Sequence, residues 1–332
     1  MHSRALLLPL LSGLATAQSL AEALSSESDL SALAGVLEQL PDVASQLGSA
    51  DNITILAPSN SALGDISADA DVPSVLSYHV LKGNYESSSF TAEKTFVHTM
   101  LEQNVTGGQV VEVVVENDEV MVNGDVGVVK ADISFDAGTI HIISSVLSPP
   151  PNISAALAST DDLSSLASAL ANASLVSTVA SLSDITVFAP NNDAFASIGD
   201  ALGGLGDDEI AGVLTYHVVQ GTVGYGSLLS NTSLETVEGG DVRITVTEAG
   251  DVMVNGAKVV VADVLVSNGV VHVIDAVLMP NSSSSSSGGG GGGEGSDDEE
   301  DGDTEEAAAP GFAPAMMMAA VAALAVALVH GL

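Results

Sequence analysis

The chain contains no cysteine, and its 332 residues include only 6 lysines and arginines against 43 aspartates and glutamates. Without cysteine there are no disulfide bonds, no thiolate metal ligands and no cysteine nucleophile. The formal net charge of −37 argues against binding to nucleic acid phosphates or to anionic lipid headgroups, because both would be repelled. Stability must therefore come from the core, and an apolar content of 46% is sufficient for about two domains.

The N-terminal residues have the pattern of a secretory signal peptide. Arg4 precedes an apolar run from Ala5 to Leu14, and Ala15-Thr16-Ala17 has the small residues of a cleavage site. We therefore predict a signal peptide over residues 1–17 and a mature chain that begins near Gln18.

A stretch of apolar residues that ends in a proline and polar residues runs from Ile185 to Phe195, and the same pattern occurs from Ile53 to Leu63. Its β-branched and aromatic residues predict a buried strand. Pro190 has no N–H, so strand pairing should end there. Asparagine or aspartate at positions 191–193 can cap a following helix. We call this strand, proline and cap the corner, and we expect it to be a structural feature that is present twice.

The order of patterns around the corner is also repeated. Leucines and valines at three- and four-residue steps predict helices before each corner, and short β-rich runs separated by turn residues predict partly antiparallel hairpins after it. The predicted strands are 109–115, 119–122, 128–133 and 139–143 in the first half, and 241–247, 252–254, 258–266 and 270–274 in the second half. Ile185 follows Ile53 by 132 residues, and Asn255-Gly256 follows Asn123-Gly124 by the same interval. Two copies of one domain explain this spacing.

Three motifs, in the same order in each half, resemble the signatures of the fasciclin domain family. They are the corner, a Tyr-His pair at positions 78–79 and 216–217, and a closing segment at positions 137–149 and 268–280. The resemblance implies an α+β fold of two tandem fasciclin domains, 18–148 and 149–281, each a β-sandwich or wedge flanked by helices. Leucines 56 and 63 stand where the second copy has phenylalanines 188 and 195, which implies different packing in the same fold.

The composition changes abruptly after Pro280. Residues 282–306 form a Ser/Gly-rich acidic linker, and residues 307–332 are apolar and free of Lys, Arg, Asp and Glu. A small-residue region, a polar spacer and an apolar tail are typical of a GPI-attachment signal. Gly302 is the candidate attachment residue and Ser296 another. The alternative is a single transmembrane anchor over residues 312–332, which lacks a basic flank.

Six Asn-x-Ser/Thr sequons are candidate glycosylation sites on exposed loops of a secreted chain. They are Asn52, Asn104, Asn152, Asn172, Asn231 and Asn281.

Four histidines invite a catalytic or metal-binding interpretation: His79, His141, His217 and His272. None has a second histidine at the close spacing of common zinc motifs. A Ser-His-Asp arrangement stays open in this serine-rich chain, although no Gly-x-Ser-x-Gly elbow is present. Because the histidines recur in equivalent motifs, we interpret them as structural residues of each core. We expect no catalytic residues, cofactor or metal.

The resemblance also implies candidate adhesion contacts, because in matrix fasciclin proteins of animals the corresponding Asp-Ile and Tyr-His positions are implicated in integrin recognition. In the first copy these are Tyr78, His79, Asp132 and Ile133, and in the second copy they are Tyr216, His217, Asp263 and Val264. Valine replaces the isoleucine in the second copy. The competing interpretation is structural: a turn aspartate beside a buried aliphatic residue, and a Tyr-His pair on a packed element.

Together these patterns predict a glycosylated surface protein without enzymatic activity, which acts in adhesion or in organising the cell wall or matrix. Its expected partners are other surface or matrix proteins or cell-wall glycans, and the membrane through a GPI anchor, but no nucleic acid. It would lie on the extracellular face of the plasma membrane or in the cell wall. The layout looks similar to that of fungal GPI-anchored fasciclin proteins. The alternatives are a secreted hydrolase or small-ligand carrier on the same fold, and a regulatory protein of internal secretory or vacuolar membranes.

Overall fold

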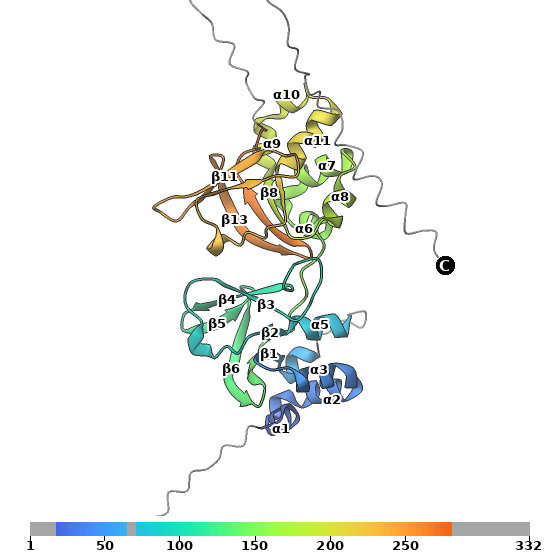
Figure 1. The fold of residues 1–332 in the computed structure, drawn as a ribbon, viewed down its shortest axis with the longest axis vertical. Helices are drawn as coiled ribbons and strands as arrows, with labels where there is room; N and C mark the ends of the chain where they lie inside the picture. The colour runs from blue at the N-terminus through green and yellow to red at the C-terminus, as the bar shows by residue number, and fades with distance from the viewer. Residues whose placement is uncertain (1–17, 65–70, 281–332) are drawn as a thin grey trace, which may run out of the picture. The chain divides into compact units, whose positions relative to one another are not determined.

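The computed structural model describes residues 18–64 and 71–280 (Figure 1). The predicted signal peptide, linker and GPI signal, together with Asn281 and Gly302, lie outside these residues. None of the helices within the described ranges has both the length and the apolar character needed to cross a membrane.

The first half combines short helices with a seven-stranded sheet. Its helices are α1 (Leu20–Ser26), α2 (Ser31–Gln39), α3 (Pro41–Ser49), α4 (Asn60–Leu63) and α5 (Val72–Tyr78), with short 3-10 turns η1 (Ser28–Leu30) and η2 (Ser87–Ser89). Its strands are β1 (Ile53–Pro58), β2 (Val80–Lys82), β3 (Thr95–His98), β4 (Val110–Glu116), β5 (Glu119–Val122), β6 (Val126–Phe135) and β7 (Gly138–Ile143).

The second half repeats this arrangement. Its helices are α6 (Ile153–Ser159), α7 (Ser164–Asn172), α8 (Val176–Ser181), α9 (Asn192–Ser197), α10 (Gly199–Leu202) and α11 (Asp207–Tyr216), with η3 (Asp161–Leu163) and η4 (Gly226–Leu228). Its strands are β8 (Ile185–Pro190), β9 (Val218–Gln220), β10 (Thr232–Glu235), β11 (Asp241–Val246), β12 (Val252–Val254), β13 (Ala257–Val266) and β14 (Gly269–Ile274). The α+β fold predicted for both halves is confirmed.

Both sheets have the same strand order. It is β2-β1-β7-β6-β5-β4-β3 in the first half, and the second half has the equivalent strands in the equivalent places. The runs from β4 to β7 and from β11 to β14 pair as antiparallel hairpins, as the turn signals predicted. The closing strands β7 and β14 also pair in parallel with β1 and β8. Each closing segment therefore lies beside the strand of its corner.

Each corner has the structure that its sequence predicted. Strands β1 and β8 are buried along their whole length and end at the prolines of the corner. The Asn191 side chain accepts a hydrogen bond from the Ala194 N–H at 2.8 Å and caps α9. Ser59 caps α4 in the same way through the Ala62 N–H at 3.3 Å. The asparagine and serine of the corner are therefore helix caps.

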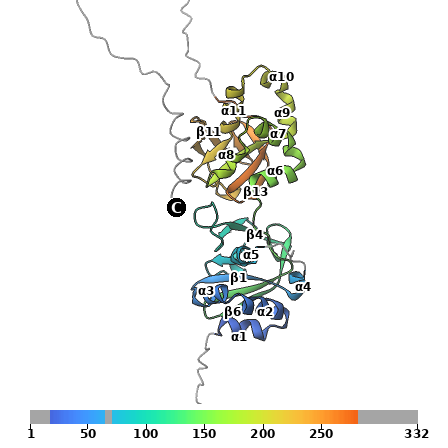
Figure 2. The same cartoon turned by 90° about the vertical axis from the view of Figure 1, so that its right-hand side faces the viewer.

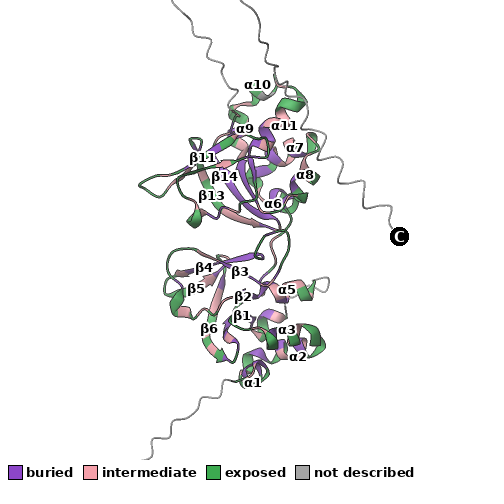
Figure 3. Ribbon diagram, in the orientation of Figure 1, coloured by how far each residue is buried: buried purple, intermediate pink, exposed green. Residues whose placement is uncertain are grey.

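Residues on either face of each sheet form separate hydrophobic clusters. In β1, Ile55 faces a cluster with α1, α2 and α3, whereas the next residue, Leu56, belongs to a cluster with Tyr78 and the strands β4 and β5. This alternation follows from the two-residue period of a strand. Figure 2 shows α1, α2 and α3 on one side of β1, and Figure 3 shows buried residues along the strands, with exposed residues on the outer surfaces of the helices.

Four strands and one pairing were missed by the sequence interpretation. The short strands β2, β3, β9 and β10 were not predicted, and neither was the parallel pairing of β1 with β7. Pro41 separates two helices: α2 ends at Gln39, and Pro41 is the first residue of α3, a position where its missing N–H costs nothing. The parallel pairing also explains Gly138, because a Cβ atom there would overlap the backbone oxygen of Ile53.

Candidate functional site

The Tyr-His pair of the first half ends α5 with both side chains in the core. Tyr78 is fully buried. Its hydroxyl donates to the Val110 carbonyl oxygen at 2.9 Å and accepts from the Asn123 Nδ2 at 3.2 Å. Burial, partly offset by the Asn123 hydrogen bond, raises the pKa of Tyr78 to about 12. The tyrosine therefore ties α5 to the β4–β5 hairpin and stays un-ionised.

His79 ties the same helix to the end of the closing segment. The Leu147 N–H donates to Nε2 at 2.9 Å, so Nε2 carries no proton and Nδ1–H donates to the Val75 carbonyl at 2.7 Å. Burial lowers the pKa of His79 to about 4, although the Val75 hydrogen bond opposes this effect. A neutral ring with both nitrogens bonded to backbone groups has no free lone pair for a metal or a substrate.

The second half repeats both contacts. The Tyr216 hydroxyl donates to the Asp241 carbonyl at 2.7 Å and accepts from Asn255 Nδ2 at 2.9 Å. His217 donates from Nδ1 to the Val213 carbonyl at 2.7 Å and accepts at Nε2 from the Leu278 N–H at 2.8 Å. Burial lowers the pKa of His217 to about 4. The core interpretation of both Tyr-His pairs agrees with these contacts.

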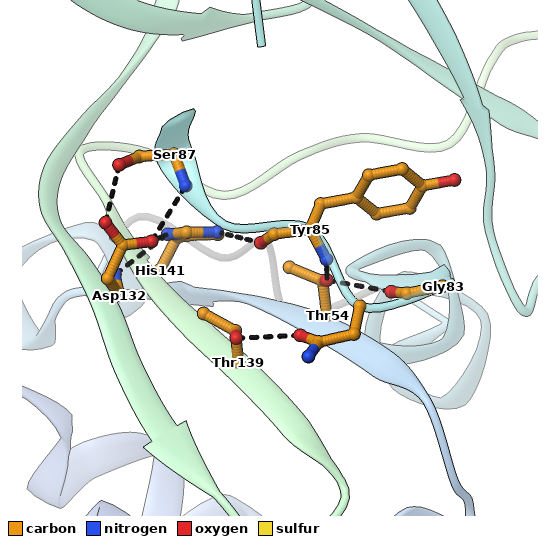
Figure 4. Close-up of polar contacts among 8 residues, drawn as sticks. Thr54, Gly83, Tyr85, Ser87, Asp132, Thr139 and His141 are labelled. Atoms are coloured by element: carbon orange, nitrogen blue, oxygen red, sulfur yellow. Dashed lines mark hydrogen bonds and ion pairs between the residues drawn. The ribbon is translucent and has the colours of Figure 1, made fainter. Parts of the chain in front are cut away.

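The second histidine of each half belongs to a network that fixes one surface loop. In the first half, His141 on β7 accepts at Nδ1 from the Asp132 N–H at 3.2 Å and therefore donates from Nε2 to the Tyr85 carbonyl at 2.9 Å. Thr54 on β1 donates to the Gly83 carbonyl and accepts from the Tyr85 N–H, both at 2.8 Å. Figure 4 shows these contacts converging on residues 83–89, which we call the clamped loop.

Asp132 holds the far end of the clamped loop. One carboxylate oxygen accepts from the Ser87 N–H at 2.8 Å, and the other accepts from the Ser87 hydroxyl (Figure 4). Asp132 itself has a φ of 62°, next to a register shift in the β6–β7 pairing. This bulge re-aims the aspartate toward the loop. Burial raises its pKa, but the Ser87 hydrogen bonds and nearby His141 outweigh burial, so the pKa of Asp132 is lowered.

The second half holds its equivalent loop in the same way but with fewer hydrogen bonds, because Val270 stands at the place of Thr139, whose hydroxyl donates to Asn84 in the first half. Asp263 (φ 64°) accepts from the Gly226 N–H at 2.6 Å, and His272 donates from Nε2 to the Gly224 carbonyl at 2.7 Å. Burial lowers the pKa of His272. Gly226 occupies the position of Ser87 and has no hydroxyl to donate to the aspartate. The two copies therefore share a framework but differ in the loop that it holds.

Ser87, Asp132 and His141 lie together, but they are not connected as a catalytic triad. In a triad the histidine stands between the serine and the aspartate and accepts the hydroxyl proton. Here the serine hydroxyl donates directly to the aspartate, while both histidine nitrogens are bonded to backbone groups. Within residues 18–64 and 71–280, no group of three or more potential metal ligands occurs. The network is arranged to position a loop.

The candidate adhesion residues divide into buried and accessible groups. Tyr78, His79, Tyr216 and His217 are at most 2% exposed. The Asp132 side chain is 45% exposed, whereas Ile133, Asp263 and Val264 are half-buried. A partner at this surface would thus meet Asp132 and the loop that it holds, and whether it contacts them stays a prediction.

Five of the six sequons lie within the described residues, and all five asparagines are exposed. Asn52 and Asn231 directly precede β1 and β10, Asn104 lies between β3 and β4, Asn152 caps α6, and Asn172 is the last residue of α7. At Asn152 and Asn231 the side-chain oxygen accepts a backbone N–H, which leaves the amide nitrogen free. Their occupancy stays a prediction.

Comparison with known proteins places these features in a family. A profile of the fasciclin domain matches residues 28–149 and 161–280. A fasciclin-like arabinogalactan protein of Arthroderma benhamiae is 30% identical over 80% of this chain and 68% of its own length. The fasciclin-like arabinogalactan protein elcF of Phaeosphaeria nodorum is 31% identical over 81% of this chain and 91% of its own.

More distant similarities extend to animal proteins. The transforming growth factor-beta-induced protein ig-h3 of Sus scrofa is 28% identical over 77% of this chain and 37% of its own. A solved FAS1 domain pair from the insect cell adhesion molecule fasciclin I aligns with 76% of this chain and 97% of its own, at 21% identity and a TM-score of 0.38.

Proposed function

Because this chain belongs to the fasciclin-domain family, we propose that it is an extracellular protein that mediates adhesion or organises the cell wall or matrix. Two of its relatives are the fasciclin-like arabinogalactan proteins of Arthroderma benhamiae and Phaeosphaeria nodorum. The chain would act by display: two folded domains, carried on the acidic linker 282–306, would present their exposed faces to surface proteins, matrix proteins or wall glycans.

This proposal rests on the hydrogen bonds of the candidate site, which hold structure in place and leave none of its polar groups arranged for catalysis within the described residues. Ser87, Asp132 and His141 hold a loop in place, and the Tyr-His pairs bind backbone groups in the core. The exposed residues of the clamped loop are Asn84, Glu86, Ser88 and Ser89, and the Asp132 side chain beside them is 45% exposed. A rigid loop loses little conformational entropy when a partner binds it, so this arrangement suits recognition.

Adhesion of cells that display the full chain tests this proposal. Ser89→Arg places a bulky cation on the clamped loop without altering any clamp contact, and Ala21→Arg makes the same change on exposed α1 as a matched control. We expect adhesion to isolated wall material or to neighbouring cells to fall in the first variant only. Equal adhesion of cells with and without the chain would contradict the proposal.

We further propose that a GPI anchor attached near Gly302 holds the protein on the outer face of the plasma membrane. The support is the sequence alone: a signal peptide at residues 1–17 and a small-residue, spacer and apolar-tail pattern up to residue 332. Phosphatidylinositol-specific phospholipase C should release the protein from intact cells, and a chain that ends at residue 306 should be secreted into the medium. Retention after phospholipase treatment, in cells stripped of wall crosslinks, would contradict a GPI anchor.

A further inference from the structure

The second half contains a cavity between α7, α9 and α11 that is nearly closed in the described part of the first half. Its volume is about 430 Å³, which falls within the range of about 300–1,000 Å³ common for small-molecule sites. The equivalent place in the first half, between α2, α4 and α5, has a cavity of about 10 Å³. Between its corner and its Tyr-His pair, the second half also has helix α10 and three more residues in α11 than α5 has. Both this longer connection and the side chains on α7 therefore differ around the cavity.

On the α7 side of the cavity, alanines replace larger side chains. Helices α2 and α7 both begin with serine and have the same length, so Ala169 stands at the place of Val36 and Ala173 at the place of Leu40. Ala169 and Ala173 both line the second-half cavity, whereas Val36 lines the nearly closed cavity of the first half. Each replacement removes methyl groups and leaves the helices in place.

The walls and the rim of the cavity differ in chemistry. Phe195 and Ile210 are half-buried and line the cavity together with the alanines. Asp207 and Asp208, in the first turn of α11, line the same cavity and are exposed. In the described part of the chain, neither carboxylate is within ion-pair distance of a lysine or an arginine. The cavity thus combines an apolar interior with two negative charges at one end.

We propose that this cavity binds a small amphiphile with an apolar body and a cationic head, such as a lipophilic amine. The apolar body would cover Phe195, Ile210 and the alanines, and burial of apolar surface would supply most of the affinity. The cationic head would lie beside Asp207 and Asp208, where the field of this acidic chain also attracts cations. Neutral or anionic amphiphiles of the same length bind more weakly.

Binding of decylamine, decanol and decanoate to the full chain tests the proposal. The Asn172 sequon lines the cavity, so the protein carries Ser174→Gly, which removes the sequon and tolerates the φ of 55° at that position. We expect decylamine to shift the ¹³C methyl signals of Ala169 and Ala173, and to bind more tightly than decanol and much more tightly than decanoate. No shift with decylamine, or equal binding of decanoate, overturns the proposal.

Two variants locate the site and its charge. Ala169→Val with Ala173→Leu restores the first-half side chains, which this fold already accommodates, and should abolish binding while thermal unfolding is retained. Asp207→Asn with Asp208→Asn should weaken decylamine about two- to twentyfold and leave decanol unchanged. Unchanged decylamine binding by either folded variant overturns the proposal. So does binding that appears only after removal of residues 307–332, because the tail of the chain would then be the occupant.

Discussion

Acid should destabilise each half of the protein through the histidine of its Tyr-His pair, and His217 offers the sharper test. It is 2% exposed, and its two ring nitrogens are bonded to the Val213 carbonyl and the Leu278 N–H. Protonation of Nε2 would turn that acceptor into a donor facing another donor. The folded state therefore resists the proton that the unfolded state readily accepts.

The magnitude follows from the pKa of His217, which burial lowers from 6.5 to about 4. Between these two values the unfolded chain binds a proton at this residue and the folded chain does not. Stability from the neutral ring is therefore complete above about pH 6.5 and is lost as the pH falls toward 4. At about 1.4 kcal/mol per pH unit, the loss in the free energy of unfolding amounts to about 3 kcal/mol near pH 4.

Urea unfolding of the protein and of a His217→Gln variant at pH 7.5 and pH 4 measures this loss. Glutamine can still accept the Leu278 N–H but does not titrate. Short deuterium-labelling pulses, read by mass spectrometry in peptides of β8 and of β1, report each half separately. The first half, with His79 unchanged, is an internal control, and the titration of carboxylates is common to both proteins.

At pH 7.5 the variant should be less stable by about 1–3 kcal/mol, because the bond to the Val213 carbonyl is lost. By pH 4 this difference should shrink or reverse, because only the natural protein loses the contribution of the neutral ring. The expected change in the difference is about 3 kcal/mol in β8 and close to zero in β1. A stability difference in β8 that stays the same at both pH values would refute the reasoning.

Four further substitutions test the fold and the clamped loop. Gly269→Ala should destabilise the second half by more than about 4 kcal/mol in thermal unfolding, because a Cβ there would overlap the backbone oxygen of Ile185. Gly212→Ala, where no atom lies close to an added Cβ on α11, should instead stabilise the protein by about 0.5–1 kcal/mol in the same measurement. Tyr216→Phe should cost about 0.5–1.5 kcal/mol in urea unfolding, since it removes both hydrogen bonds of the buried Tyr216 hydroxyl. Asp132→Ala should speed hydrogen exchange in the clamped loop without unfolding the sheet; unchanged exchange there would argue against the clamp.

The fold was predictable to the extent that its signals are local. The corner needs only a strand, a proline and a cap within a few residues, and both copies form as predicted. The antiparallel hairpins were equally accessible, because turn residues such as Asn123-Gly124 join neighbouring strands. Internal repetition then strengthened each signal, since a pattern found twice at the same spacing seldom arises by chance.

Non-local pairing was not predictable in this way. Strand β1 pairs in parallel with β7, about 85 residues later along the chain, and no periodicity records such a partner. Strand β10 was missed for a different reason. Its sequence, Thr232 to Glu235, is largely exposed at the edge of the sheet, so it lacks the apolar alternation of a half-buried strand.

The candidate site was likewise predictable only where its signals are local. Asp132 and Asp263 were singled out next to the closing segments, and both prove to be bulge residues with positive φ. Their partners could not be inferred, because Ser87 lies 45 residues from Asp132 and is one of many serines. Aspartate is one of the few non-glycine residues that often adopt a positive φ, so its sequence hints at the backbone conformation. Its hydrogen-bonding partner, however, is determined only by the folded sheet.

Duplication explains why the two halves can differ in function while they share a fold. The side chains that define the fold are buried and bonded to backbone atoms. They are the tyrosines and histidines of the two Tyr-His pairs, the histidines of β7 and β14, and the threonines of β1 and β8. Backbone atoms are present whatever the neighbouring side chains are, so these contacts constrain few other positions. Ser87 could therefore become Gly226, and Val36 could become Ala169, without loss of the framework. We accordingly expect the two halves to bind different partners, the first half through its clamped loop and the second half through the cavity between its helices.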